Sequence, residues 1–348
     1  MGFQRLSKFF SADIGIDLGT ANCLVYVRGK GVVLTEPSVV AIMENTNAVL
    51  AVGSEAKNML GKTPRNIKAV RPMKEGVIAV FDITEDMIRF FIQKALHSVF
   101  WYRRLLRPTV MIAVPYGITE VETRAVKDSA KRAGAGDVEL IEEPMAAAVG
   151  VGLPVVDPVG SMIVDIGGGT TEVAVTSLGG IVLSSSLRSA GDEIDNAIVA
   201  YMKRKHNVLI GEMTAEMLKK NIGSVVPMAD RGNMVIRGRN LLNGLPATLA
   251  VTSAEVREAM SEQVSRIIDC IRTTLENTPP ELSSDIYDNG IMLAGGGALL
   301  SGLDLLIQQL TGIRTMIAKN PMDCVAMGIG KVIDSVGELN GIVNFRTR

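Results

Sequence analysis

The sequence predicts an α/β protein made of two related domains, and three observations lead to this prediction. The chain has 348 residues, which is enough for two or more domains of ordinary size. Residues 13–27 and 162–175 share one pattern, in which a short apolar strand, a glycine-containing turn and a second strand follow one another. Strands such as Thr109–Val114 precede helices, as in α/β folds. Because the repeated segments lie nearly half a chain apart, we expect two related domains that face each other.

The two repeated segments are predicted to be β-hairpins whose turns bind phosphate. They read DIGIDLGTANCLVYV and MIVDIGGGTTEVAV, so an aspartate, Asp17 or Asp165, stands at the end of each first strand. Each turn offers backbone N–H groups that no large side chain obstructs, and such clusters bind anions. The aspartates repel phosphate, so we expect them to bind Mg²⁺ through water, because Mg²⁺ keeps most of its hydration shell. The alternative is a pair of ordinary hairpin turns.

A third glycine cluster follows the apolar strand at residues 291–294. It comprises Gly295, Gly296 and Gly297, and Ala298 and Leu299 come next. The predicted helix beyond it carries Leu303, Leu306, Ile307 and Leu310. Glycines at a strand-to-helix turn let a ligand lie against bare backbone near a helix N-terminus. Beside two phosphate hairpins, the cluster is interpreted as the nucleoside end of a site, although a tight turn would use the same residues.

Several helices can be placed from their own sequence signals. Thr119 with Glu122 three residues later is a capping box, and the helix it begins is expected to stop at Gly134. A longer helix, ended by Pro279 and Pro280, places on one face Val256, Met260, Val264, Ile267, Ile271 and Leu275. Two helices of small residues, at 144–150 and 321–330, are suited to close crossing at a hinge between two lobes. Simple packing in a core is the alternative for these two.

Composition excludes several classes of protein. Lys and Arg number 36 against 37 Asp and Glu, whereas a dedicated nucleic-acid binder would have a strong basic excess. Two histidines are too few for a histidine metal cluster, and the three scattered cysteines fit a reducing cytoplasm better than a disulfide framework. Gly61-Lys62-Thr63 lacks the first glycine of a Walker A loop, because Ala56 stands in its place. A nucleotide would therefore bind through a motif other than a Walker A loop.

Two short segments are candidates for contact with a membrane surface, although no stretch approaches a membrane span in length. Residues 1–10 are predicted to form a basic amphipathic helix with an apolar face of Phe3, Leu6, Phe9 and Phe10. Residues 99–107 combine three arginines with the apolar Phe100, Trp101, Leu105 and Leu106, a composition typical of an interfacial loop attracted to anionic lipid. The alternative is that these aromatic residues cap the core.

Together these motifs resemble the actin, heat-shock chaperone and sugar kinase superfamily, and within it the MreB family of bacterial actin-like proteins. The resemblance rests on IDLGTAN at 16–22, IEEPMAAA at 141–148, VDIGGGTTEVAV at 164–175 and LAGGGALL at 293–300, and it covers essentially the whole chain. It implies a duplicated ribonuclease-H-like fold of two lobes, each with a mixed five-stranded sheet and one small insertion. The implied divisions are a lobe I core (11–36, 77–155, 325–348) with insertion 37–76, and a lobe II core (156–190, 251–324) with insertion 191–250.

The resemblance also implies ATP and Mg²⁺ as cofactors and assigns the residues that hold them. Asp17 and Asp165 would organise Mg²⁺ through water. The phosphates would contact Thr20, Ala21, Asn22, Gly167, Gly168, Gly169 and Thr170. The nucleoside would contact Gly295, Gly296, Gly297, Ala298 and Leu299, together with Glu216, Met217, Leu218 and Lys219 from a helix at 214–219. Most relatives carry a basic residue where this chain has Met217, so one contact to the nucleotide is in doubt.

Glu143 is the candidate to orient and deprotonate the attacking water, with help from Thr170, because it matches the family's catalytic position just before a hinge helix. The alternative is that Glu142 and Glu143 only stabilise a helix dipole, and we prefer this role for Glu142.

The resemblance implies slow ATP hydrolysis coupled to assembly into filaments, as paired antiparallel protofilaments on the inner face of the plasma membrane. Its partners would be cell-wall elongation proteins, including a transmembrane adaptor, and its function would be to set the rod shape of the cell. Three rivals stay open: a sugar kinase, a heat-shock-type chaperone, and a structural polymer that hydrolyses too slowly to matter.

Overall fold

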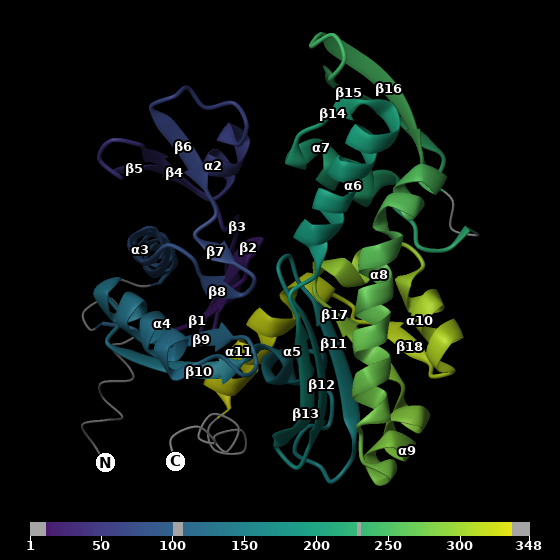
Figure 1. Ribbon diagram of the computed structural model, residues 1–348. Helices are drawn as coiled ribbons and strands as arrows, with labels where there is room; N and C mark the ends of the chain where they lie inside the picture. The colour runs from purple at the N-terminus through teal and green to yellow at the C-terminus, as the bar shows by residue number, and fades with distance from the viewer. Residues whose placement is uncertain (1–11, 100–106, 228–230, 336–348) are drawn as a thin grey trace.

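The computed structural model describes residues 12–99, 107–227 and 231–335, and its framework is a pair of five-stranded sheets. The first sheet has the order β10-β9-β1-β2-β3 and the second β13-β12-β11-β17-β18 (Figure 1). The strands of the first are β1 (Asp13–Leu18), β2 (Asn22–Val27), β3 (Gly31–Pro37), β9 (Thr109–Val114) and β10 (Asp137–Glu142). Those of the second are β11 (Ser161–Ile166), β12 (Thr171–Ser177), β13 (Gly180–Leu187), β17 (Ile291–Ala294) and β18 (Thr315–Ile317).

The two sheets have the same topology. In each, the first three strands form an antiparallel meander, a fourth strand pairs in parallel with the first of them, and a fifth pairs in parallel with the fourth. The predicted hairpins are confirmed. β1 pairs antiparallel with β2, with Leu18 opposite Cys23 next to the turn, and β11 pairs antiparallel with β12, with Ile166 opposite Thr171. The duplicated α/β fold is therefore confirmed. We call residues 12–142 lobe I and residues 161–323 lobe II.

Helices cover both sheets. Lobe I contributes α3 (Phe81–His97) and α4 (Glu120–Arg132); lobe II contributes α6 (Gly191–His206), α8 (Ser253–Glu276), α9 (Pro280–Asn289) and α10 (Leu303–Thr311). The capping box of α4 is present as predicted, since Thr119 Oγ1 accepts the Glu122 N–H and Glu122 accepts the Thr119 N–H. The predicted face of α8 is buried in the lobe II core from Val256 to Ile271, while Leu275 packs at its edge.

Each lobe carries a smaller sheet at the same end of the molecule (Figure 1). In lobe I this sheet consists of β4 (Val40–Met43), β5 (Val49–Val52) and β6 (Ile67–Val70), accompanied by α2 (Ser54–Met59). A short ribbon, β7 (Met73–Lys74) and β8 (Val77–Ile78), follows it. In lobe II the small sheet consists of β14 (Val208–Leu209), β15 (Asn233–Asn240) and β16 (Pro246–Thr252), accompanied by α7 (Glu212–Ile222).

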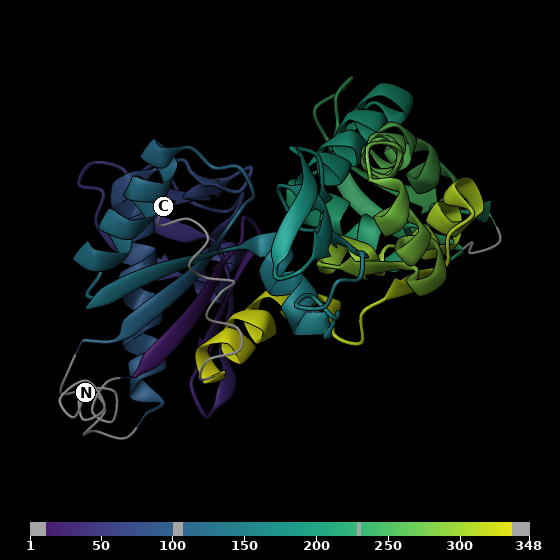
Figure 2. The same ribbon diagram turned by 90° about the horizontal axis from the view of Figure 1, so that it is seen from below.

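The lobes are joined through α5 (Glu143–Val151) and α11 (Cys324–Asp334), which cross between them (Figure 2). The crossing is very close: a methyl group added at Gly150 would lie 1.9 Å from the carbonyl oxygen of Cys324, and one added at Gly328 would lie 1.8 Å from that of Ala146. Side chains of α5 and α11 form one buried cluster with residues of both sheets, such as Ala113 and Ile163. The close crossing predicted from small residues is confirmed.

The predicted membrane segments lie outside the described residues. This applies to Phe3, Leu6, Phe9 and Phe10, and also to Phe100, Trp101, Leu105 and Leu106. Among the helices that the structure describes, none combines the length and the apolar character that crossing a bilayer requires.

Candidate functional site

A cavity of about 430 Å³ lies between the lobes, and the two glycine turns form part of its wall. The turns lie against each other. A methyl group added at Gly168 would be 2.5 Å from the Cβ of Ala21, and one at Gly169 would be 2.6 Å from Thr20 Oγ1. Glycine is therefore required at these positions for the two lobes to approach. A third loop joins them, because the Gly76 N–H donates to Thr20 Oγ1 at 3.0 Å.

The N-terminus of α6 lies behind the second turn. The Gly191 N–H donates to the carbonyl oxygen of Gly167 at 3.2 Å, and the Asp192 N–H donates to that of Gly168 at 2.8 Å. These bonds hold the turn in place and direct the partial positive charge of the helix terminus towards this part of the cavity. Anions are favoured at such a position.

Acidic side chains gather where the strands of both sheets end. Asp17, Glu143 and Asp165 line the cavity. Burial, and then the charge of Asp165, raises the pKa of Asp17 to about 8. Burial, and then Glu172, raises the pKa of Asp165 to about 7. The pKa of Glu143 is raised well above its usual range by burial and by the charges of Asp17, Glu172 and Asp165. Clustered carboxylates that raise one another's pKa form a site that a cation stabilises.

The donor set of this cluster fits Mg²⁺ bound through water. Within the ranges that the structure describes, no group of three or more His, Cys, Asp or Glu residues is close enough to hold a metal ion by itself. Mg²⁺ keeps several waters and is held in nucleotide sites by one or two carboxylates and the substrate phosphates. Asp17 and Asp165, one from each lobe, match that requirement.

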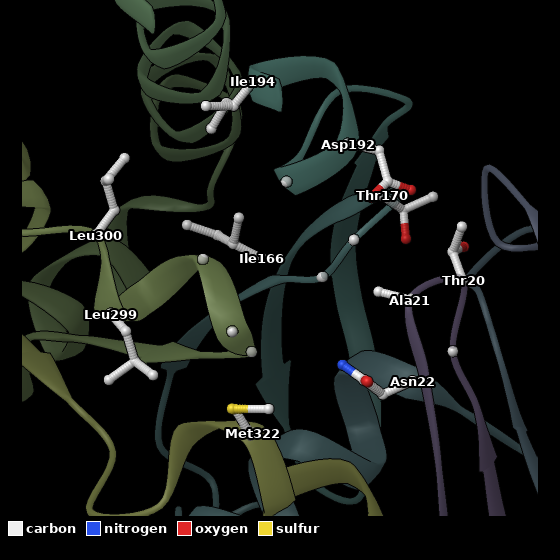
Figure 3. A pocket seen from close by; sticks show the side chains of 18 of the residues that line it. Thr20, Ala21, Asn22, Ile166, Thr170, Asp192, Ile194, Leu299, Leu300 and Met322 are labelled. Carbon is white, nitrogen blue, oxygen red and sulfur yellow. The ribbon is translucent and has the colours of Figure 1, made fainter. Parts of the chain in front are cut away.

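The opposite end of the cavity is apolar. Figure 3 shows the side chains of Ile166, Ile194, Leu299, Leu300 and Met322 on one side of the pocket, and those of Thr20, Asn22, Thr170 and Asp192 on the other. Leu299 is 55% exposed and Met322 is 42% exposed, although both are large apolar residues. An apolar end joined to an anion-binding end fits an amphipathic ligand such as a nucleotide.

The third glycine cluster lies at this apolar end, in the short 3₁₀ helix Gly296–Leu299 and the residue before it. A methyl group at Gly295 would lie 2.3 Å from the Ile166 carbonyl oxygen, and one at Gly297 would lie 2.2 Å from Ile166 Cγ2. Both glycines therefore serve close packing of the loop on β11. Only Gly296 has open space beside it, with Met322 Cγ at 4.0 Å.

Charged residues from both insertions meet at the rim. Lys57 Nζ lies 2.9 Å from Glu216 Oε2, and Arg71 forms an ion pair with Glu212, so each pair joins lobe I to α7. Burial alone would raise the pKa of Glu216, but hydrogen bonds from Lys220 and Lys57 lower it to about 2. These two contacts hold the insertions together over the cavity.

Most of the predicted site residues line this one cavity. They are Asp17, Thr20, Ala21, Asn22, Glu143, Asp165, Gly167, Gly168, Gly169, Thr170, Glu216, Lys219, Gly295, Gly296, Gly297 and Leu299. Lys219 is already engaged there, because its Nζ donates to Asp195 Oδ2 and to the Gly191 carbonyl oxygen, both at 2.8 Å.

Three of the residues predicted to contact the nucleotide do not line the cavity. Leu218 and Ala298 are fully buried in the lobe II core, and Met217 is 39% exposed on another face of α7. For Met217 and Leu218 the helical period explains the difference, because residues three and four apart share a face whereas consecutive residues do not. Glu216, Lys219 and Lys220 satisfy that spacing and line the cavity.

Sequence reasoning missed several lining residues, among them Lys57, Arg71, Asp192, Asp195 and Met322. A signal was available for Asp192 and Asp195, which lie in the first turns of the helix that follows the second hairpin unit. No local signal marks Lys57 or Arg71, because only the packing of the insertions brings them to the cavity.

Comparison with known proteins agrees with this arrangement. The family described as MreB/Mbl protein matches residues 11–341. The cell shape-determining protein MreB of Escherichia coli is 52% identical over 337 residues, which cover 96% of each chain. The cell shape-determining protein Mbl of Bacillus cereus is 50% identical, over 95% of this chain and 98% of that protein.

Solved structures give the same result. MreB5 of Spiroplasma citri bound to ADP superposes with a TM-score of 0.87 and 39% identity, covering 93% of this chain and 97% of that one. A structure of the same Spiroplasma protein bound to AMPPNP is 40% identical, with a TM-score of 0.84 over 91% of this chain and 94% of that one. The present chain therefore belongs to the MreB/Mbl protein family and has the actin-like fold.

Proposed function

We propose that this protein is an actin-like ATPase that binds Mg-ATP in the cavity between its lobes. The observation that carries the proposal is the contact of two glycine turns from opposite lobes, with Asp17 and Asp165 at the ends of the strands that lead into them. The phosphates lie against the turns and the N-terminus of α6. The base lies among Ile194, Leu299 and Met322.

In this proposal the residues of each lobe have separate tasks. Backbone N–H groups of residues 20–22 and 168–170 contact the phosphates, since the Gly167 N–H already donates to the Thr170 carbonyl oxygen at 2.9 Å. Asp17 and Asp165 would hold Mg²⁺ through water. Mg²⁺ supplies neutralisation of phosphate charge when it is bound. Glu143 accepts a proton from the water whose oxygen bonds to the γ-phosphorus, while the bond from that phosphorus to the β-phosphate oxygen breaks and ADP leaves. The Thr170 hydroxyl orients that water. Phosphoryl transfer depends mainly on such positioning and charge stabilisation.

We further propose that the two lobes divide as the sequence predicted, into cores and insertions, with α5 and α11 as the hinge. ATP binding closes the insertions over the cavity and favours assembly into filaments of paired antiparallel protofilaments. Near-zero net charge, 36 basic against 37 acidic residues, does little to oppose such self-association. The filaments lie on the inner face of the plasma membrane and guide cell-wall synthesis together with elongation proteins and a transmembrane adaptor.

Calorimetry tests the nucleotide site directly. The purified chain is expected to bind ATP in the presence of Mg²⁺, and removal of the metal with EDTA is expected to weaken binding at least about tenfold, since phosphate charge is then opposed by the two aspartates. Asp165→Asn should reduce the effect of Mg²⁺, whereas Asp137→Asn, an exposed aspartate at the start of β10, should not. Absence of ATP binding by the unsubstituted chain with Mg²⁺ would end the proposal. Light scattering with ATP, ADP and a non-hydrolysable analogue then tests assembly.

Liposome co-sedimentation tests the membrane proposal. Filaments of the unsubstituted chain are expected to pellet with anionic vesicles, because many weak apolar and basic contacts act together along a filament. The double variant Phe9→Ser with Trp101→Ser is expected to stay in the supernatant while still scattering light as a filament. A double variant that pellets like the unsubstituted chain would remove both segments from membrane binding.

A further inference from the structure

Glu172 is a buried carboxylate that has no part in the proposed nucleotide contacts. It stands on β12, opposite Asp165 in the hairpin register, and is 1% exposed. It does not line the cavity. Burying a carboxylate is costly unless hydrogen bonds satisfy it. The two groups that donate hydrogen bonds to Glu172 therefore indicate its role.

The two hydrogen bonds of Glu172 lead in different directions. Its Oε1 accepts from Ser186 Oγ at 2.6 Å, and Ser186 lies on the neighbouring strand β13 of the same lobe. Its Oε2 accepts from the backbone N–H of Tyr116 at 3.2 Å. Tyr116 belongs to lobe I, two residues after the end of β9. One carboxylate thus connects the second phosphate hairpin with a loop of the opposite lobe.

The loop that Glu172 holds is packed against the phosphate turns. A methyl group at Gly76 would lie 2.7 Å from Pro115 Cγ and 3.1 Å from Thr170 Cγ2, so these three residues are in close contact. The Gly76 N–H also donates to Thr20 in the first turn. A shift of Tyr116 would therefore displace Pro115 and Gly76, and these would displace Thr20 and Thr170.

We propose that Glu172 is a positioning residue for ATP hydrolysis, and that its hydrogen bond to Tyr116 sets the distance between the first turn and Thr170. This inference rests on the proposed hydrolytic function. The reach of the side chain, rather than its charge, is what the bond requires. Glutamine has the same length, can accept the Tyr116 N–H with its oxygen and can donate to Ser186 with its amide. Aspartate keeps the charge but is one methylene shorter.

The experiment compares Glu172→Gln, Glu172→Asp and the control Ser186→Ala in the full chain. Ser186→Ala removes the hydrogen bond within lobe II and leaves the bond between lobes intact. We expect Glu172→Asp to lower kcat by about 10-fold, the upper end of the range for loss of one ordinary hydrogen bond, with KM for ATP changed by less than about threefold. Glu172→Gln and Ser186→Ala should keep kcat within about threefold of the unsubstituted chain.

Hydrogen exchange at the Tyr116 amide supplies a readout that does not depend on hydrolysis. Exchange should accelerate in Glu172→Asp and stay slow in Glu172→Gln and Ser186→Ala, with melting temperatures showing that each variant is folded. Turnover lost in Glu172→Gln, or retained in Glu172→Asp, would overturn the proposal. So would equal exchange in all four proteins. If the unsubstituted chain hydrolyses no ATP, the hydrolytic function and the positioning role fall together, while the exchange result still decides whether the bond between lobes exists.

Discussion

Glu143→Ala is expected to lower ATP turnover by about 10²- to 10⁴-fold, the usual contribution of a general base, while ATP binding is retained. The side chain lines the cavity at the first residue of α5, and burial together with Asp17, Glu172 and Asp165 raises its pKa well above the usual range. A general base must lie within reach of the attacking water, and Glu143 lines the cavity together with Asp17 and Asp165. Phosphate release gives the turnover, and calorimetry gives the affinity for Mg-ATP in parallel.

Glu142→Ala is the matched control. Glu142 is the adjacent acidic residue and the N-cap of α5, and it does not line the cavity. Its substitution should leave turnover within about threefold of the unsubstituted chain, because it lies outside the reaction site. Unchanged turnover in Glu143→Ala, or an equal loss in both variants, would remove Glu143 from the mechanism.

Gly328→Ala is expected to destabilise the protein by about 3 kcal/mol or more, at the upper end of the usual cost of overpacking. The added methyl group would lie 1.8 Å from the Ala146 carbonyl oxygen and 2.6 Å from the Ala146 carbonyl carbon. These are backbone atoms of α5, so no side chain can rotate away and the two helices must separate. The midpoint of urea unfolding, with the slope of the transition, measures the change.

Met327→Ala provides the comparison within the same helix. Met327 precedes Gly328 in α11 and is 38% exposed, so its truncation removes less buried surface than truncation of a core residue and adds no atom between the helices. We expect its urea midpoint to stay close to that of the unsubstituted chain. A Gly328→Ala protein as stable as Met327→Ala would show that α5 and α11 are not held as closely as described. Because Glu143 begins α5 and Val325 of α11 lines the cavity, weaker ATP binding should accompany the loss of stability.

Local sequence signals predicted the elements whose causes are local. The two hairpins follow from glycine turns between strands, and the start of α4 follows from the side chain of Thr119 and the backbone of Glu122. The buried face of α8 follows from apolar residues at helical spacing. Each of these features depends on residues within a few positions of one another, so a pattern along the chain is sufficient to reveal it.

Residues that meet only through packing escaped prediction. Lys57 meets Glu216 and Tyr116 meets Glu172, although each pair is far apart in the chain. Gly295 and Gly297 line the cavity, and their lack of a side chain also admits the backbone and side chain of Ile166, which no local pattern indicated. The sequence does not distinguish a glycine that allows close packing from one that leaves backbone open to a ligand. Only its neighbours in space do so.

The sequence by itself determined the duplicated hairpins, the small-residue helices and the family to which the chain belongs, because these depend on motifs of contiguous residues. The tertiary structure alone decided which face of α7 meets the cavity, which charges join across its rim, and how a buried glutamate connects the lobes. The physical reason is that hydrogen bonds and ion pairs act over a few ångströms in space, whatever the separation of their partners in the chain.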